Sequence, residues 1–80
     1  MDLNEFRLTI RLKEELLTAI EKEMSAKDIS QGEVARRIGV LRRNVNQVMG
    51  RKKIASLDYI LKIAESIGLD VEMRVRKPKA

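Results

Sequence analysis

Ser30, Gly39 and Gly50 divide the middle of the chain into two segments of helical length. Around Ser30 the sequence has the form of a capping box, in which the serine hydroxyl accepts from the amide of residue 33 while the Glu33 side chain reaches back to the amide of Ser30. Gly39 permits the left-handed turn that ends a helix, and Gly50 provides a second stop. The chain must therefore fold with two short, consecutive helices joined by a tight turn.

The segments on either side carry periodicities of their own. Residues 57–67 have apolar side chains at helical spacing behind Ser56, a residue type that caps helices well. Apolar and polar residues alternate near both ends of the chain, which indicates half-buried strands, although the N-terminal alternation also fits a helix. The expected elements are a strand at 5–11, helices at 12–27, 31–38, 41–49 and 57–67, and a strand at 69–76. They predict one mainly α domain over residues 1–80.

Length and composition exclude several classes of protein. Eighty residues are close to the smallest size at which a chain buries enough apolar surface to fold, so help from a partner chain is expected. The sequence has no cysteine and no histidine, which removes disulfides, thiolate metal sites, the commonest metal ligand and the commonest general base. Its carboxylates stand at ordinary charge-pair spacing along the predicted helices. We therefore expect no enzyme, no metal and no cofactor.

The sequence contains no sign of a membrane segment or an export signal. No apolar run approaches the ~20 residues that cross a bilayer, and the start of the chain lacks the basic-then-apolar form of a signal peptide. These features predict a soluble, cytoplasmic protein.

Positive charge is concentrated in one part of the chain. The net charge is +5. Residues 31–53 hold seven basic side chains and one acidic side chain, whereas the other 57 residues hold ten basic and eleven acidic ones. Such a local field favours a polyanion, of which nucleic acid is the common example. A basic membrane-surface helix is a weaker interpretation, because glycines interrupt this window and it contains no Trp or Phe anchor.

The second short helix has an unusual outer face. Its apolar residues recur at helical spacing and form a thin inner seam of Leu41, Val45, Val48 and Met49. The outer face carries arginines and amides, namely Arg42, Arg43, Asn44, Asn46 and Gln47. Arginine pairs with guanine and Asn or Gln with adenine through two hydrogen bonds, whereas a merely solvated helix usually carries Glu and Lys. An ordinary solvated face is the alternative, but the pattern favours contact with base edges.

Several positions of the two short helices form a familiar set. They are Ser30-Gln31 at the start of the first helix, Ala35, Gly39 at the turn, and the apolar Val45 and Val48. With these features, residues 30–69 resemble the lambda-repressor-like, or XRE-type, helix-turn-helix family. The resemblance implies a mainly α, four-helix or five-helix lambda-repressor-like domain. The alternating segments add short N- and C-terminal β-strands, of which the N-terminal one is not a feature of that family. Leu41 differs from the small polar N-cap that is usual before the second helix.

The resemblance also implies which residues touch DNA. The residues expected to read base edges are Arg42, Arg43, Asn44 and Gln47. The residues expected at backbone phosphates are Gln31, Asn46, Arg51, Lys52 and Lys53. Base contacts set sequence preference and phosphate contacts set register, so the two groups should respond differently to mutation.

The helix at 57–67 with the alternating segment after it is similar to a narrower group, the antitoxins of host-inhibition-of-growth toxin–antitoxin pairs. Those proteins repress their own operon and bind a small ribonuclease toxin. The resemblance therefore implies a second candidate function, in which the chain neutralises a toxin protein while it autoregulates its operon.

The two predicted strands raise the question of a partner chain. They can pair within one chain, but a lone two-stranded ribbon is marginally stable, so we favour a sheet shared across a homodimer. The side chains expected at that interface are Phe6, Leu8, Ile10, Leu69, Val71, Met73 and Val75. Two helices related by a two-fold axis would then enter major grooves about 34 Å apart and read a palindrome.

These patterns together predict a sequence-specific transcriptional regulator that binds double-stranded DNA. We expect a dimeric autorepressor that reads a palindromic operator through the major groove, with the antitoxin as the alternative. RNA binding ranks lower, because Phe6 and Tyr59 are the only aromatic residues and offer no platform for stacked bases.

Overall fold

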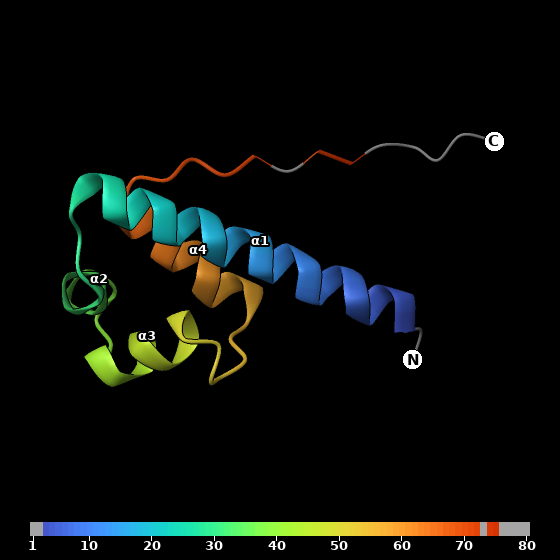
Figure 1. Ribbon diagram of the computed structural model, residues 1–80, viewed down its shortest axis with the longest axis horizontal. Coiled ribbons are helices and arrows are strands. Elements are labelled where there is room, and N and C mark those ends of the chain that lie inside the picture. Colours follow the sequence, from blue (N-terminus) through green and yellow to red (C-terminus); the bar gives the residue numbers. More distant parts are fainter. Residues whose placement is uncertain (1–2, 73, 76–80) are drawn as a thin grey trace.

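The computed structural model describes residues 3–72, 74 and 75, with side chains from Arg7 onward, and this part of the chain contains four helices (Figure 1). They are α1 (Leu3–Lys27), α2 (Gln31–Ile38), α3 (Arg42–Met49) and α4 (Leu57–Ser66). The prediction of a mainly α fold is confirmed, and α2, α3 and α4 begin and end within one residue of the predicted helices.

The predicted N-terminal strand at 5–11 is wrong. Residues 3–27 form one continuous helix, so the helix predicted at 12–27 is the C-terminal part of α1. Ile10, Leu17 and Met24 follow one another at intervals of seven residues and therefore lie along one side of this helix. A helix satisfies its own backbone hydrogen bonds, whereas a strand at this end of the chain would need a second strand beside it.

The four helices enclose one apolar core. α1 packs on α4, while α2 packs on both α3 and α4. Figure 1 shows α1 and α4 side by side, with α2 and α3 below them. The buried side chains of the core are Leu17, Ile20, Met24, Val34, Ala35, Val45, Val48, Met49, Ile60, Ile63, Ala64 and Ile67. Since α3 contributes three of them, its inner face is held by the core and its opposite side is left for contacts outside the domain.

Two cations from other helices hold the C-terminal end of α4. The Lys27 ammonium donates a hydrogen bond of 2.7 Å to the Ile67 carbonyl, and the Arg37 guanidinium donates one of 2.7 Å to the Ser66 carbonyl. Positive groups satisfy the free carbonyls of a helix end and interact favourably with its dipole. These bonds join α1 and α2 to the end of α4.

The predicted C-terminal strand is not formed in the part of the chain that the structure describes. Residues 69–72, 74 and 75 have no regular secondary structure, and Met73 and residues 76–80 lie outside the described residues. After Gly68, where φ is 75°, the chain turns back and runs beside α1 toward the N-terminal end of that helix (Figure 1). Because residues 5–11 belong to α1, they cannot supply the second strand that such a segment needs.

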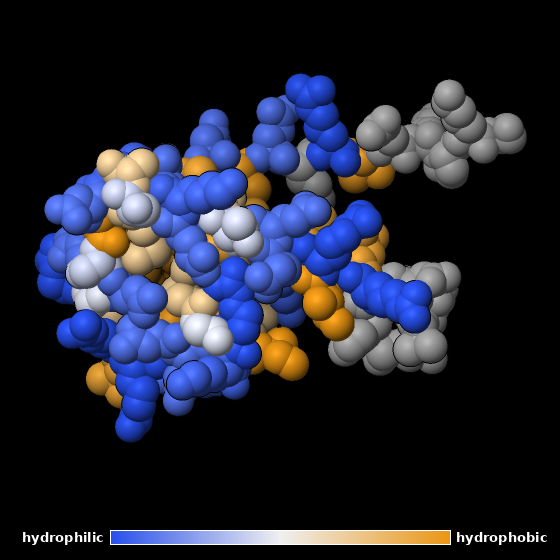
Figure 2. All heavy atoms as spheres, viewed as in Figure 1, coloured by the Kyte–Doolittle hydropathy of each residue, from blue (hydrophilic) through white to orange (hydrophobic). Residues whose placement is uncertain are grey.

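The N-terminal half of α1 extends beyond the other helices (Figure 1). Its Leu8 and Ile10 side chains are 47% and 54% exposed. Figure 2 shows apolar side chains on the surface at this projecting end, next to a largely hydrophilic surface over the rest of the molecule seen from that side. Despite this apolar exposure, no helix within the described ranges combines the length and apolar character that a membrane span requires.

Candidate nucleic-acid interface

One of the two bonds of the capping box predicted at the start of α2 is formed. Ser30 has extended backbone angles, and its hydroxyl accepts from the Glu33 amide at 3.1 Å. The Glu33 carboxylate instead binds Arg36 and Arg37, with 3.0 Å between its Oε1 and the Arg37 Nε. These bonds, those from Arg36 first, lower the pKa of Glu33 from 4.5 to about 2. The carboxylate thus stays ionised in the first turn, where the helix dipole favours negative charge.

The Glu33 ion pairs should make stability depend on pH in acid. A folded-state pKa below the unfolded value means that the contribution is present above about pH 4.5 and is lost as the pH falls through about 2. We expect Glu33→Gln to melt slightly below the wild type at neutral pH, because the pairs are exposed, and at the same temperature near pH 2. Glu15→Gln, at an exposed carboxylate outside these pairs, is the control. An equal deficit at both pH values would contradict the prediction.

The turn between α2 and α3 depends on Gly39. Its φ of 73° and ψ of 36° place it in the left-handed region, which glycine adopts without steric cost. The Val40 amide then donates to the Ala35 carbonyl at 3.0 Å, which satisfies one of the last carbonyls of α2. Leu41 occupies the N-cap of α3 with an extended backbone, and its side chain makes no capping bond and is 62% exposed.

Leu41→Ser should therefore supply the N-cap bond that Leu41 cannot make. The N-cap backbone of Leu41 already has the angles that a capping serine adopts, and a hydroxyl there can accept from the amides of the first turn of α3. We expect Leu41→Ser to be about 1 kcal/mol more stable than Leu41→Ala in urea denaturation. Alanine is the right reference, because both variants remove the same exposed isobutyl group. If the two variants unfold at the same urea concentration, residue 41 does not act as the N-cap.

The inner and outer sides of α3 carry different kinds of side chain. Val45, Val48 and Met49 are buried in the core. Arg43 and Gln47 lie on the side of the helix opposite to these residues, with Arg43 exposed and Gln47 half-buried. On this outward side an arginine or an amide can meet a flat partner without a neighbouring helix in the way.

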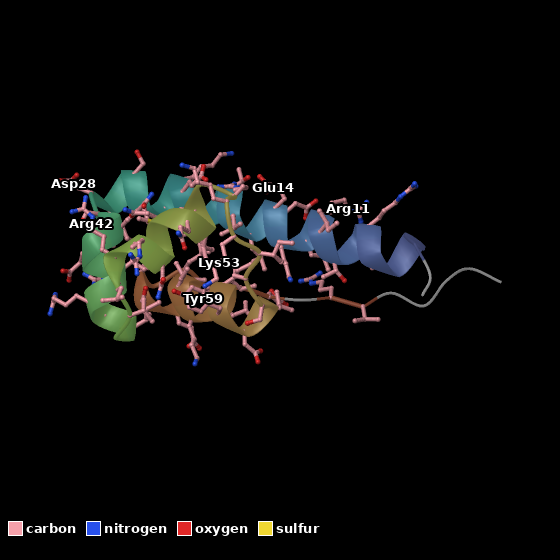
Figure 3. The ribbon with its side chains drawn as sticks, turned by 90° about the horizontal axis from the view of Figure 1, so that it is seen from below. Arg11, Glu14, Asp28, Arg42, Lys53 and Tyr59 are labelled. Carbon is pink, nitrogen blue, oxygen red and sulfur yellow. The ribbon has the colours of Figure 1, made fainter. Side chains whose placement is uncertain are left out.

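Arg42 lies on the flank of α3 that adjoins the first turn of α2 (Figure 3). A methyl group added at Gly32 would come 3.5 Å from its Cδ, which is ordinary contact distance. Gln31, expected at a phosphate, is the first residue of α2 and is half-buried. The structure thus brings Arg42 to the positive end of α2, where Gln31 begins the helix and where an anion is favoured.

Asn44 lies on the other flank of α3, at a hollow of about 190 Å³ between α3 and the start of α4. Lys53, Ser56 and Tyr59 also line this hollow, and Figure 3 shows Lys53 and Tyr59 close to each other. The Tyr59 hydroxyl is buried and has no hydrogen-bond partner among the described residues. Burial raises the pKa of Tyr59, so the phenol stays protonated as a donor. The sequence alone did not distinguish this tyrosine from an ordinary surface residue.

The loop after α3 presents two lysines. The amides of Lys52 and Lys53 both donate to the Gln47 carbonyl, at 2.8 and 3.2 Å, and thereby fix this loop on the last turn of α3. Both lysine side chains are exposed, as is that of Asn46 on the adjoining turn. These three residues remain suited to the phosphates beside the groove in which α3 would lie.

Arg51, the fifth residue expected at a phosphate, is engaged elsewhere. Its guanidinium binds the Glu14 carboxylate on α1, with 2.9 Å between Nη2 and Oε1, and also binds Glu21 and the Met49 carbonyl. The hydrogen bonds from Arg51 lower the pKa of Glu14. These partners could not be identified from the sequence because they lie 37 and 30 residues before Arg51, although charges of the right sign were present on α1.

The residues expected at a dimer interface are placed as follows. Leu8 and Ile10 are exposed on the projecting half of α1, and Val71 and Val75 are 40% and 89% exposed. Leu69 is half-buried and packs against the core of its own chain. The Phe6 side chain and Met73 lie outside what the structure describes.

Within the described residues, no group of three or more carboxylate, histidine or cysteine side chains could hold a metal ion.

A comparison with protein families matches residues 5–76 to the family described as helix-turn-helix domain. No significant match exists among curated proteins or among solved structures. The matched residues include all of α2, the turn at Gly39 and all of α3. The chain therefore belongs to the helix-turn-helix domain family.

Proposed function

We propose that this chain is a sequence-specific transcriptional regulator that binds double-stranded DNA by placing α3 in the major groove. The observation that carries the proposal is the arrangement of α3, whose apolar face is buried in the core while Arg43 and Gln47 point away from it. A helix braced in this way fits the width of the major groove, and these two side chain types match the edges of guanine and adenine.

The other residues of the interface fall around this centre. Arg42 beside α2, and Asn44 beside α4, flank the outward side and can extend base reading to its two edges. Gln31, Asn46, Lys52 and Lys53 are assigned to the phosphates on either side of the groove. The concentration of positive charge in residues 31–53 supports this division, because phosphate contacts supply most of the sequence-independent affinity.

We further propose that the chain acts as a homodimer on a palindromic operator and represses its own gene. Two features support a second copy: the apolar side chains exposed on the projecting half of α1, and the extended segment after Gly68, which has no strand beside it within the described chain. Antiparallel pairing of two such segments across a two-fold axis would satisfy their backbone groups.

Selection from a library of random duplexes tests the proposal, and it does not require the operator sequence. A dimer of this kind should enrich two inverted half-sites whose centres are separated by about 10 base pairs, or a multiple of that spacing. Enrichment of a single half-site would support sequence-specific DNA binding and contradict the proposed dimer. If no sequence is enriched while binding to duplex DNA is retained, base reading by α3 is excluded.

The antitoxin function is a second candidate, and one observation favours it. A hollow of about 250 Å³ lies between the projecting half of α1 and the loop after α3, with Ile10, Leu17 and Ile54 among its lining residues. Ile54 is 87% exposed, so a partner protein could bury it. Co-expression with the product of an adjacent gene that encodes a small basic ribonuclease-like protein tests this function. Relief of growth inhibition by the wild type and not by Ile54→Asp would support it.

A further inference from the structure

We propose that Arg51 is a positioning residue, which joins the end of α3 to α1 and so sets the placement of the DNA-contacting loop, and that it does not bind phosphate itself. The inference rests on the proposed function, in that α3 and Lys52–Lys53 are taken to meet DNA. It differs from the role that the basic character of the loop implies, which groups Arg51 with its two neighbouring lysines.

The backbone turns Arg51 away from those lysines. Its φ of 59° lies in the left-handed region, which residues other than glycine adopt only at a steric cost. Its amide donates to the Val48 carbonyl at 3.1 Å, in the pattern that closes the end of a helix. The side chain thus leaves the loop on the side of α1, whereas Lys52 and Lys53 are exposed and Lys53 lines the hollow beside Asn44.

The guanidinium uses all three of its nitrogens. Nε lies 3.1 Å from both oxygens of Glu14, Nη2 lies 2.9 Å from Oε1 of Glu14, and Nη1 binds Glu21. Nη1 also donates to the carbonyl of Met49, the last residue of α3. One side chain therefore holds two carboxylates, which stand two turns apart on α1, and the end of the recognition helix.

This link acts where the packing is otherwise thin. α3 packs mainly on α2, and the extensive contacts of α1 are with α4. Arg51 supplies a direct polar connection between α1 and α3, and its fork of donors is suited to holding two carboxylates in a fixed geometry. The loop amides of Lys52 and Lys53 follow directly, so loss of the Arg51 anchor would loosen this loop while the charges of both lysines stay beside the DNA.

The charges around Arg51 also disfavour a phosphate. With Glu14 and Glu21 ionised, the three groups together carry one negative charge. A phosphate would have to displace at least one of these carboxylates and approach the other, which is a like charge. Lys52 and Lys53 have no ion-pair partner among the described contacts, and so offer the uncompensated positive charge of this loop.

The salt dependence of DNA binding separates the two roles. A lysine or arginine at a phosphate contributes about one unit to the slope of log affinity against log salt concentration, whereas a positioning residue contributes none. With the duplex that the wild type selects from the random library, we expect Arg51→Ala to weaken binding about tenfold at unchanged slope. Lys52→Ala, the matched control, should lower the slope by about one. A loss of about one unit of slope in Arg51→Ala would overturn the proposal.

Removal of the Glu14 carboxylate, the partner of Arg51, changes the affinity for DNA in opposite directions under the two roles. If Arg51 positions α3, Glu14→Gln weakens binding relative to Glu15→Gln, which removes the same charge from the next residue of α1 without touching Arg51. If Arg51 binds phosphate, Glu14→Gln releases the guanidinium and binds DNA more tightly than Glu15→Gln. The second result would contradict the proposal.

Amide hydrogen exchange distinguishes failure of this inference from failure of the proposed function. If the wild type bound no duplex DNA, the proposed function would fall, and the exchange rates would still test the anchor. We expect Arg51→Ala to speed exchange of the Lys52 and Lys53 amides while the amide of Ile63, in the core helix α4, exchanges as in the wild type. Unchanged exchange in the loop would refute the positioning role.

Discussion

Arg43→Ala is expected to remove most of the preference of this chain for its operator over random duplex DNA. Arg43 lies exposed on the side of α3 opposite to the core, where a guanidinium can donate two hydrogen bonds to one guanine. Each such contact contributes roughly 1–3 kcal/mol of discrimination, which corresponds to a loss of about 5-fold to 150-fold in the specificity ratio. Competition titrations of labelled operator against random duplex measure this ratio directly.

Lys52→Ala is the matched control for that experiment. It removes one positive charge, as Arg43→Ala does, but from a side chain assigned to phosphate, so binding to operator and to random duplex should weaken by the same factor. Both residues are exposed, so neither variant should change the melting temperature appreciably. The reverse pattern, with specificity lost in Lys52→Ala and retained in Arg43→Ala, would show that α3 is not the reading element.

Truncation after Gly68 is expected to convert the proposed dimer to a monomer and to weaken operator binding by at least about 100-fold. The truncation removes the extended segment that we propose to pair across the two-fold axis. A monomer keeps one recognition helix and loses the gain in affinity that comes from linking two binding modules, which is commonly about 10²-fold to 10⁴-fold. Light scattering gives the oligomeric state, and anisotropy titration with the operator gives the affinity.

A second truncation, after Asp70, separates assembly from folding. Leu69 packs on the core, and its amide donates to the Ala64 carbonyl at 3.0 Å. The chain that ends at Gly68 lacks Leu69, so its folding as a monomer would also be destabilised. The chain that ends at Asp70 retains these contacts and should melt near the wild type, yet should still be monomeric. If it remains dimeric, the two copies associate through another surface, of which the exposed side chains of α1 are the candidates.

The helices near the site could be predicted because their limits are encoded locally. Ser30 caps α2, Gly39 adopts the left-handed angles that end it, and Ser56 caps α4 by accepting from the Tyr59 amide at 3.2 Å. The prediction for the N-terminal segment was wrong because alternating apolar residues over a short stretch fit both a strand and a helix. Backbone pairing decided between them, since the described part of the chain offers residues 5–11 no partner strand and a helix needs none.

The outward face of α3 could likewise be predicted from helical spacing, but the partners of the basic residues could not. Arg37 meets the end of α4 at Ser66, and Arg51 meets Glu14 on α1, across 29 and 37 residues of sequence. From the composition, both arginines contribute to the positive charge expected to attract DNA, whereas in the fold their side chains join helices. Arg42 was expected at a base, and only packing placed its side chain beside Gly32 at the start of α2.

The most direct measurement of the central claim is a fluorescence-anisotropy competition between DNA from upstream of this gene and a scrambled duplex of the same length. It should be made at several salt concentrations, with the wild type and with Arg42→Ala/Arg43→Ala. We predict a large preference of the wild type for the upstream DNA, its collapse in the double variant, and a steep loss of affinity with salt in both proteins. Equal, salt-sensitive binding of the wild type to both duplexes would contradict autoregulation through base reading by α3.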